Sequence, residues 1–346
     1  MAIADGIILK VGDGRAPSGA LDLGERVLAP GFVDLQVNGV GDVDFADATP
    51  DDWRRACDEL TRHGVTSFCP TFVSAPLDAY DARLASATCA RDDADSRPDA
   101  ATIVGVHLEG PFLGAAPGAH DRTTIVPGAV PWVEALLHSH PGLVRMVTLA
   151  PEADAGFHVT RTLCAAGVVV ALGHSTATYD QAITATDAGA TVVTHLFNAM
   201  GPLHHREPGL AGAALDDPRL TPTLIADLVH VHPAALRLAI ARKANLALVS
   251  DVVTSGSVDV DAVRTPEGRL AGAATLLDRA VANVVGLGES IERAIAMAAA
   301  VPARVAGLDD RGSITAGKRA DLVALDPTSL AVDSVWVGGQ RLEGDR

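Results

Sequence analysis

The chain has few cysteines, and its basic residues are outnumbered by acidic ones. The four cysteines lie far apart among 346 residues and form no C-x-x-C pair, so we expect buried or free thiols in a reducing cytoplasm. Lys and Arg total 27 against 43 Asp and Glu, which gives a formal charge of −16. This balance argues against a nucleic-acid or anionic-membrane surface, because such surfaces need clustered cations. An anionic substrate would therefore depend on a local basic group.

Long apolar runs and a nucleotide-binding signature are also missing. No charge-free apolar run reaches ~18 residues, so we expect no transmembrane helix. The first residues lack the pattern of a signal peptide, and we expect a cytoplasmic protein. No G-x-G-x-x-G follows the first apolar run, which disfavours a doubly wound open sheet as the alternative fold.

Short apolar runs alternate with segments that carry helical start and stop signals. In the first such segment, Thr49 can cap a helix, Pro50 suits its first position, and Gly64 can end it. Further helices are expected at 76–92, 128–139, 156–166, 178–188 and 233–243, and in an Ala-rich stretch that ends at Pro302. The predicted strands are 27–37, 65–71, 102–110, 143–151, 168–175, 191–200, 222–231 and 246–251. Eight strand–helix units predict an α/β fold, a TIM-like (β/α)₈ barrel.

The two ends of the chain do not fit the barrel pattern. Residues 1–26 and 312–346 contain short strand-like segments with Gly turns, and neither end has enough apolar residues to bury a core alone. We therefore predict a small β-sandwich domain built from both ends, beside a barrel over 27–311.

Polar and ionisable residues stand at the ends of the predicted strands. Enzymes with this barrel place their catalytic residues there. Taken singly, a buried His is more often a hydrogen-bonded core residue, a strand-end Asp is often a helix cap, and Asn38-Gly39 is a common turn pair. The strand-end residues are Gln36, Asn38, His107, Glu109, His174, His195, Asn198, Asp227, His230, His232 and Asp251.

Taken together, these residues indicate a metal-assisted site. Burying several ionisable groups on one rim without purpose would cost several kcal/mol in desolvation. Glu109, His174 and His195 make a three-ligand set with one position left open for water, as in catalytic zinc sites. A carboxylate that is not a ligand, such as Asp251, can then take a proton from that water.

Several longer stretches match one known family, in order, over nearly the whole chain. They are "PGFVDLQVNG", "VHLEGPFL", "GHS", "THLFNAMGPLHHREPGLAGA", "IADLVHVH", "LVSD", "LAGAATLL" and "GSITAGKRADLVALD". The combination of "THLFNAM" with "REPGLAG" is the most specific. On these residues the chain resembles the N-acetylglucosamine-6-phosphate deacetylases of the amidohydrolase superfamily.

The resemblance implies a role for each matching position. One divalent metal per chain, with zinc expected, would bind to Glu109, His174 and His195. Many amidohydrolases carry His-x-His at the end of the first strand for a second metal. Here Gln36 and Asn38 would fill that vacated position through an ordered water, because carboxamides are poor zinc ligands.

Catalytic and substrate-binding residues are implied in the same way. Asp251 would be the catalytic acid and base, and His120 in "PGAHD" would help to polarise the acetyl carbonyl. His204 and His205 fit exposed loop residues as well as they fit functional ones, and the role of His232 stays open. The substrate-contacting set would be Ala119, His120, Asn198, Ala199, Arg206, His230, Leu270, Ala271 and Gly272.

The implied function is metal-dependent hydrolysis of N-acetylglucosamine 6-phosphate to glucosamine 6-phosphate and acetate. The same chemistry on the galactosamine epimer or another N-acyl compound stays open, as does a barrel that only senses the sugar phosphate. In the resembling enzymes an arginine that matches Arg206 grips the phosphate in the neighbouring subunit, as its planar fork suits two oxygens. The resemblance therefore implies a homodimer, whereas the residues alone also allow Arg206 as a solvated loop residue.

Overall fold

Parallel strands form the centre of the molecule. The computed structural model describes all residues except 13, 15, 255–261, 267 and 343–346. Each strand pairs with the next one along the chain in parallel register, as expected when a helix returns the chain after each strand. In order around the barrel these strands are β4 (Phe32–Val37), β7 (Val65–Val73), β9 (Val106–Glu109), β10 (Val144–Leu149), β11 (Val169–Leu172), β12 (Val192–Val193), β13 (Thr221–Leu224) and β14 (Ala247–Leu248). Each of the eight predicted runs overlaps one of these strands.

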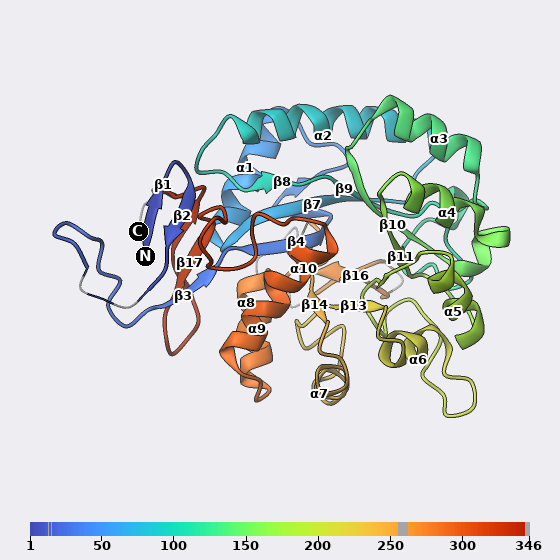
Figure 1. Ribbon diagram of the computed structural model, residues 1–346. Helices are drawn as coiled ribbons and strands as arrows, with labels where there is room; N and C mark the ends of the chain where they lie inside the picture. Colours follow the sequence, from blue (N-terminus) through green and yellow to red (C-terminus); the bar gives the residue numbers. More distant parts are fainter. Residues whose placement is uncertain (13, 15, 255–261, 267, 343–346) are drawn as a thin grey trace.

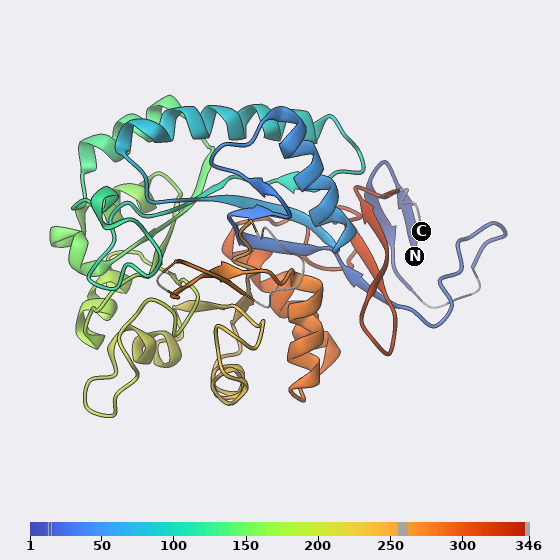
Figure 2. The ribbon, with the colours of Figure 1, turned by 180° about the vertical axis from the view of Figure 1, so that it is seen from behind.

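Helices surround these strands (Figures 1 and 2). In α1 the Thr49 hydroxyl accepts from the Asp52 amide, and the Asp52 carboxylate accepts from the Thr49 amide, so the helix begins at a capping box. Val33, Met146 and Val249, from distant parts of the sequence, share one cluster of buried apolar side chains. The helices are α1 (Pro50–Arg62), α2 (Tyr80–Asp95), α3 (Val130–Ser139), α4 (His158–Ala165), α5 (Tyr179–Asp187), α6 (Gly209–Asp216), α7 (Pro233–Arg242), α8 (Leu277–Gly286), α9 (Ile291–Ala298) and α10 (Ala300–Val305). No helix within the described ranges is long and apolar enough to cross a membrane.

The prediction that Pro302 ends the Ala-rich helix is wrong. α9 stops at Ala298, and Ala299 leaves helical geometry with φ −129° and ψ −69°. Pro302 lies inside the first turn of α10, where the backbone amides have no partner within the helix in any case. Proline therefore fits the start of a new helix here.

Hydrogen bonds between the first and last strands close the barrel. The Asp251 amide donates to the Gln36 carbonyl at 2.9 Å, and the Asn38 amide donates to the Val252 carbonyl at 2.8 Å. Beneath them, Oδ1 of the fully buried Asp34 accepts from the amides of Gln36 and Ser250, both at 3.2 Å. The closure thus brings the polar ends of strands one and eight into contact.

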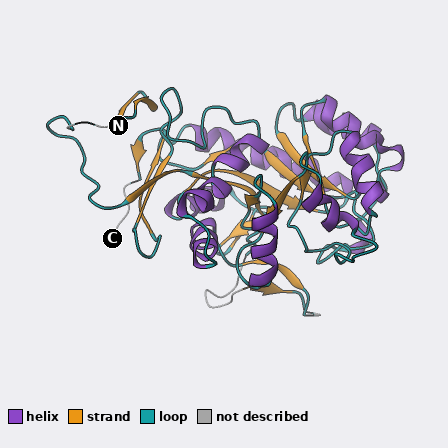
Figure 3. Cartoon of the chain, turned by 60° about the horizontal axis from the view of Figure 1, so that its bottom comes forward, coloured by secondary structure: helices purple, strands orange, loops and turns teal. Residues whose placement is uncertain are grey.

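Antiparallel strands from both ends of the chain form a separate layer, drawn as strands and loops beside the helix-covered barrel in Figure 3. Ile8 packs with Leu322 and Trp336 in a core of its own. Hydrogen bonding pairs residues 27–30 with β17, so this strand joins the terminal layer although our predicted boundary placed it in the barrel. The strands are β1 (Ala2–Ala4), β2 (Ile7–Lys10), β3 (Val27–Pro30), β17 (Leu322–Leu325), β18 (Val332–Val337) and β19 (Gln340–Arg341).

Among the described residues, five short strands lie beside the eight strands of the barrel. β8 (Thr102–Ile103) pairs with β7, and two hairpins flank the C-terminal ends of the barrel strands. One hairpin consists of β5 (Gly39–Val40) and β6 (Val43–Asp44), and the other of β15 (Ala262–Arg264) and β16 (Leu270–Ala273).

Asp34 predicts a pH dependence of stability. Burial raises the pKa of Asp34 from 3.8 to about 7, against the hydrogen bonds from Ser250 and Gln36. A raised pKa means that the folded state holds the proton more tightly, so this contribution is full below pH 4 and lost as the pH rises to 7. Asp34→Asn should therefore gain stability relative to wild type, by a few kcal/mol between pH 4 and 8, in denaturant titrations. The exposed Asp22→Asn controls for charge loss alone, and a pH-independent difference for Asp34→Asn would contradict the assignment.

Candidate active site

Four of the barrel strands deliver ionisable side chains to one mouth. Glu109 ends β9, whereas His174, His195 and Asp251 follow β11, β12 and β14 by two or three residues. These three residues have left-handed backbones, with φ of 50°, 32° and 50°. Such conformations are costly for residues other than glycine and are found where a site demands them. The turns aim each side chain into the mouth instead of along the strand.

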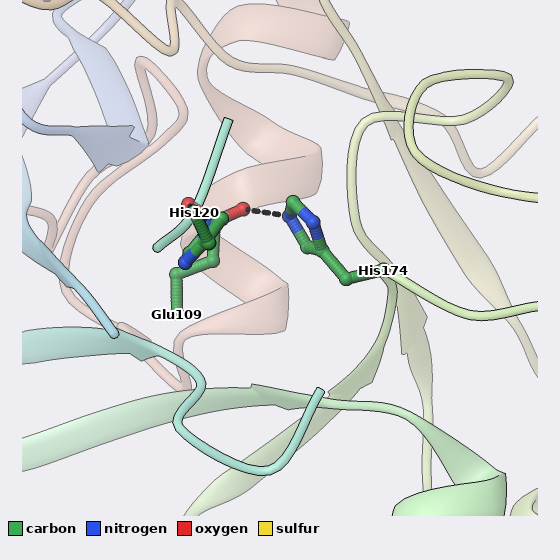
Figure 4. Close-up of side chains that lie close together, drawn as sticks. All are labelled: Glu109, His120 and His174. Carbon is green, nitrogen blue, oxygen red and sulfur yellow. Dashed lines mark hydrogen bonds and ion pairs between the residues drawn. The ribbon is translucent and has the colours of Figure 1, made fainter. Parts of the chain in front are cut away.

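A buried carboxylate lies at the centre of the mouth. Oε1 of Glu109 is 2.9 Å from Nε2 of His174 and 3.0 Å from Nε2 of His195, and the two nitrogens are 3.0 Å apart. Figure 4 shows the His174 ring facing this carboxylate. Burial would raise the pKa of Glu109, but the charge of His174 and hydrogen bonds from the surrounding histidines outweigh it and hold this pKa well below its usual range. The carboxylate is therefore an anion.

Hydrogen bonding fixes the protons on two of the histidines. Nδ1 of His174 donates to the Pro117 carbonyl at 3.2 Å, because a carbonyl can only accept, so in the neutral ring the lone pair lies on Nε2. Nδ1 of His120 accepts from the Ser74 amide at 3.2 Å, so its Nε2 carries the proton. That proton points toward Oε2 of Glu109, which is 3.6 Å from Nε2. His174 is an acceptor and His120 a donor.

The donor set fits a divalent cation. Glu109, His120 and His174 offer ligand atoms within 4.8 Å of one another, which marks a candidate metal site. Nε2 of His195 completes a triangle of possible ligand atoms, because it lies 3.0 Å from both Oε1 of Glu109 and Nε2 of His174. Nδ1 of His195 is buried with no partner among the described residues. A proton can satisfy one edge of such a triangle, whereas a cation satisfies all three atoms.

The two carboxamides of the first strand connect the carboxylates. Nε2 of Gln36 donates to Oε1 of Glu109 at 2.9 Å and to Oδ1 of Asp251 at 3.0 Å. Nδ2 of Asn38 donates to the same Asp251 oxygen at 2.8 Å. These contacts are direct, between side chains of the first strand and the two carboxylates. Burial raises the pKa of Asp251, and the charge of Glu109 raises it further, against the hydrogen bond from Asn38.

A pocket of about 510 Å³ opens above these groups. Gln36 lies buried beneath it, and Arg206 is exposed on the loop after β12, where its guanidinium meets Nε2 of His205 at 2.8 Å instead of the pocket. The other predicted residues line it together: Asn38, Glu109, Ala119, His120, His174, His195, Asn198, Ala199, His230, Asp251, Leu270, Ala271 and Gly272.

Sequence reasoning missed several residues of the pocket. Ser74, which holds His120, follows the second strand, and the end of that strand carried no ionisable residue to attract attention. Arg83 lines the pocket from the first turn of α2, a position that helical periodicity does not distinguish. Asp44 and Asp47 reach it from the β5–β6 hairpin and the loop behind it.

Comparisons with known proteins agree with this geometry. The amidohydrolase family matches residues 27–342. The N-acetylglucosamine-6-phosphate deacetylase of Bos taurus is 38% identical, over 92% of this chain and 84% of its own length. The chain belongs to the N-acetylglucosamine-6-phosphate deacetylase family of the amidohydrolases. This confirms the resemblance seen in the sequence.

Two other relatives show how broad the match is. The N-acetylgalactosamine-6-phosphate deacetylase of Escherichia coli O157:H7 is 36% identical, over 98% of this chain and 93% of its own. The structure of a mutant N-acetylglucosamine-6-phosphate deacetylase from Mycobacterium smegmatis, in complex with N-acetylglucosamine 6-phosphate, superimposes with a TM-score of 0.90. That enzyme is 34% identical, and the alignment covers 98% of this chain and 93% of the other. The fold is thus that of the deacetylases throughout.

The proton positions predict different metal content for histidine variants. His174→Asn and His195→Asn should lose bound metal after gel filtration in metal-free buffer, because each removes a lone pair that faces Glu109. His120→Asn should retain the metal and lose activity. Elemental analysis by mass spectrometry measures the content, with the exposed His138→Asn as the control. Equal metal loss in His120→Asn would show that His120 is a ligand.

Proposed function

We propose that the protein removes the N-acetyl group from N-acetylglucosamine 6-phosphate, giving glucosamine 6-phosphate and acetate. The observation that carries this proposal is a second, partly buried carboxylate, Asp251, beside the Glu109–His174–His195 cluster in one pocket. Family membership supports the substrate class. A protein that only sensed the sugar would need neither the cluster nor a proton acceptor beside it.

The ligand set proposed is Glu109, His174 and His195, for one divalent metal with zinc preferred. Imidazole and carboxylate ligands with one open position suit zinc. When bound, the metal would polarise the acetyl carbonyl and lower the pKa of a water. The amides of Gln36 and Asn38 occupy the region beside Asp251, which supports one metal and not two.

Asp251 is placed to move the proton. Its Oδ1 already accepts from Gln36 and Asn38, so proton transfer falls to Oδ2. The carboxylate takes a proton from water as the oxygen adds to the acetyl carbon, and gives it to the amine nitrogen as the C–N bond breaks. The sum is one water consumed, with acetate and an amine released. The two amide donors hold the carboxylate in one orientation throughout.

His120 is placed to act on the carbonyl. The Ser74 amide keeps Nδ1 deprotonated, so Nε2–H is a neutral donor at the mouth of the cluster. Donation from Nε2 to the acetyl oxygen would stabilise the negative charge that develops there. His120 lines the pocket together with Ala119, Asn198 and Ala199, which we assign to sugar binding.

A second candidate substrate is the galactosamine epimer. The 36% identity with the N-acetylgalactosamine-6-phosphate deacetylase of Escherichia coli O157:H7 extends over 98% of this chain, further than the match with the bovine enzyme. The chemistry of Asp251 and the metal set is the same for both. Only contacts with one sugar hydroxyl would differ.

Arg206 is proposed to complete the site of a second subunit. It is exposed and does not line the pocket of its own chain. That pocket contains Asp44, Asp47 and Asp121 but only Arg83 as a Lys or Arg side chain among the described residues. A dianionic phosphate would gain from a further guanidinium. A two-fold dimer would supply it to each site, which supports a homodimer.

The substrate assignment is tested by acetate release from four sugars. N-acetylglucosamine and N-acetylgalactosamine, each with and without 6-phosphate, are compared after chelation and after zinc is restored. We expect the fastest turnover with N-acetylglucosamine 6-phosphate and recovery with zinc. Asp251→Asn keeps Oδ1 as an acceptor, so it should retain metal and lose turnover by a factor of about 10³ or more. A near-normal rate in this variant would remove Asp251 from the mechanism.

Arg206 predicts complementation between two inactive variants. Arg206→Ala chains mixed with Asp251→Asn chains form dimers in which one site has both wild-type residues. About a quarter of the wild-type activity at low substrate should return, since half of the dimers are mixed and each has one good site. Native mass spectrometry of the mixture measures subunit exchange, and the exposed Arg237→Ala, mixed in place of Arg206→Ala, controls for loss of a surface arginine. Verified exchange without recovery would show that Arg206 does not act in trans.

A further inference from the structure

We propose that Asp227 determines how the site recognises phosphate, by holding a proton on Nδ1 of His230. This inference rests on the proposed function. The inference itself places the phosphate end of the sugar phosphate at His230. Asp227 is then a positioning residue, since it acts on the substrate only through the imidazole.

The contacts of Asp227 divide its two oxygens between different tasks. Oδ1 accepts from the amides of Val229 at 2.9 Å and His230 at 2.8 Å. Oδ2 is 2.6 Å from Nδ1 of His230, and the side chains of Asp227 and His230 are 0% and 4% exposed. The turn that joins them includes Leu228 in the left-handed region, with φ 68°. One oxygen therefore stabilises a strained turn, and the other is free to set the state of the ring.

The short contact to Oδ2 determines which nitrogen carries the proton. A carboxylate oxygen accepts, so Nδ1 of His230 must donate, and the pocket sees only Nε2. Burial opposes ionisation of Asp227, but the hydrogen bond and charge of His230 hold its pKa below the usual value. The anion behind the ring therefore holds Nδ1, whereas Nε2 is open to the pocket.

The protonation state decides what Nε2 can bind. In the neutral ring with Nδ1–H, Nε2 is a lone pair that repels a phosphate oxygen but accepts from a hydroxyl. In the imidazolium, Nε2 donates a charge-assisted hydrogen bond to phosphate. The carboxylates of Asp44, Asp47 and Asp121 line the same pocket. Cationic side chains are few among the described residues that line it. The negative charge of Asp227 then lets His230 take up a second proton and become a cation when phosphate binds.

Asp227→Asn separates this role from a structural one. The amide oxygen can still accept from Val229 and His230, but its NH₂ group then faces Nδ1, which must become an acceptor. The proton moves to Nε2, and the ring stays neutral. We expect KM for N-acetylglucosamine 6-phosphate to rise about tenfold, because a neutral hydrogen bond replaces a charged one. KM for unphosphorylated N-acetylglucosamine should change less than twofold, and kcat much less than kcat/KM.

Nitrogen-15 NMR of histidine in the zinc-loaded protein gives a measurement independent of turnover. The His230 signals are identified by their loss in His230→Gln. In wild type we expect Nδ1–H without ligand and a doubly protonated ring with glucosamine 6-phosphate bound. In Asp227→Asn we expect Nε2–H in both states. Asp227→Asn should add no further rise in KM to His230→Gln.

Matched controls distinguish failure of this inference from failure of the proposed function. Asp154 is also buried and caps backbone amides, at Val159 and Thr160, but does not line the pocket. Asp154→Asn should leave the ratio of the two KM values unchanged. Equal KM increases for both sugars in Asp227→Asn, or Nε2–H in wild type, would overturn the inference. If wild type shows no preference for the phosphorylated sugar, the proposed substrate fails, and the NMR result still decides the role of Asp227.

Discussion

The buried carboxylate of Glu109 is the constraint on which the rest of the site depends. A carboxylate removed from water is costly unless charges and donors surround it. Here His174, His195 and the amide of Gln36 all lie within 3.0 Å of one oxygen. Three electron-rich atoms pointing at one another are stable only with a cation or protons between them. The protein alone thus indicates a candidate metal site at this carboxylate.

The closure of the barrel and the organisation of the site involve the same residues. The backbone bond from Asp251 to Gln36 joins the last strand to the first, and the Gln36 side chain then spans from Asp251 to Glu109. A shift of one residue in this register would turn Gln36 away from the mouth, since side chains alternate along a strand. Register errors at the seam are therefore disfavoured both by packing and by the two carboxylates, Glu109 and Asp251, which would lose their donors.

The sequence was informative about strands and their ends, because buried strands are apolar and ionisable residues interrupt them visibly. It could not predict Ser74 or Arg83, since a serine after a strand and an arginine in a helix are common everywhere. The sequence also could not predict the proton positions on the histidines. Whether Nδ1 of a histidine donates depends on whether a carbonyl or an amide lies opposite. The pairing of β3 with β17 was missed because residues 27–37 form one apolar run, and only long-range hydrogen bonds divide it.

Two histidines of the pocket are held in opposite tautomers by different partners. The Ser74 amide leaves His120 with Nε2–H, whereas the Asp227 carboxylate fixes Nδ1–H on His230. A neutral donor suits a carbonyl, which gains negative charge only during the reaction. A cation suits a phosphate, which is anionic from the start. In the roles proposed for them, the same side chain would serve catalysis at one end of the pocket and recognition at the other, according to the group behind it.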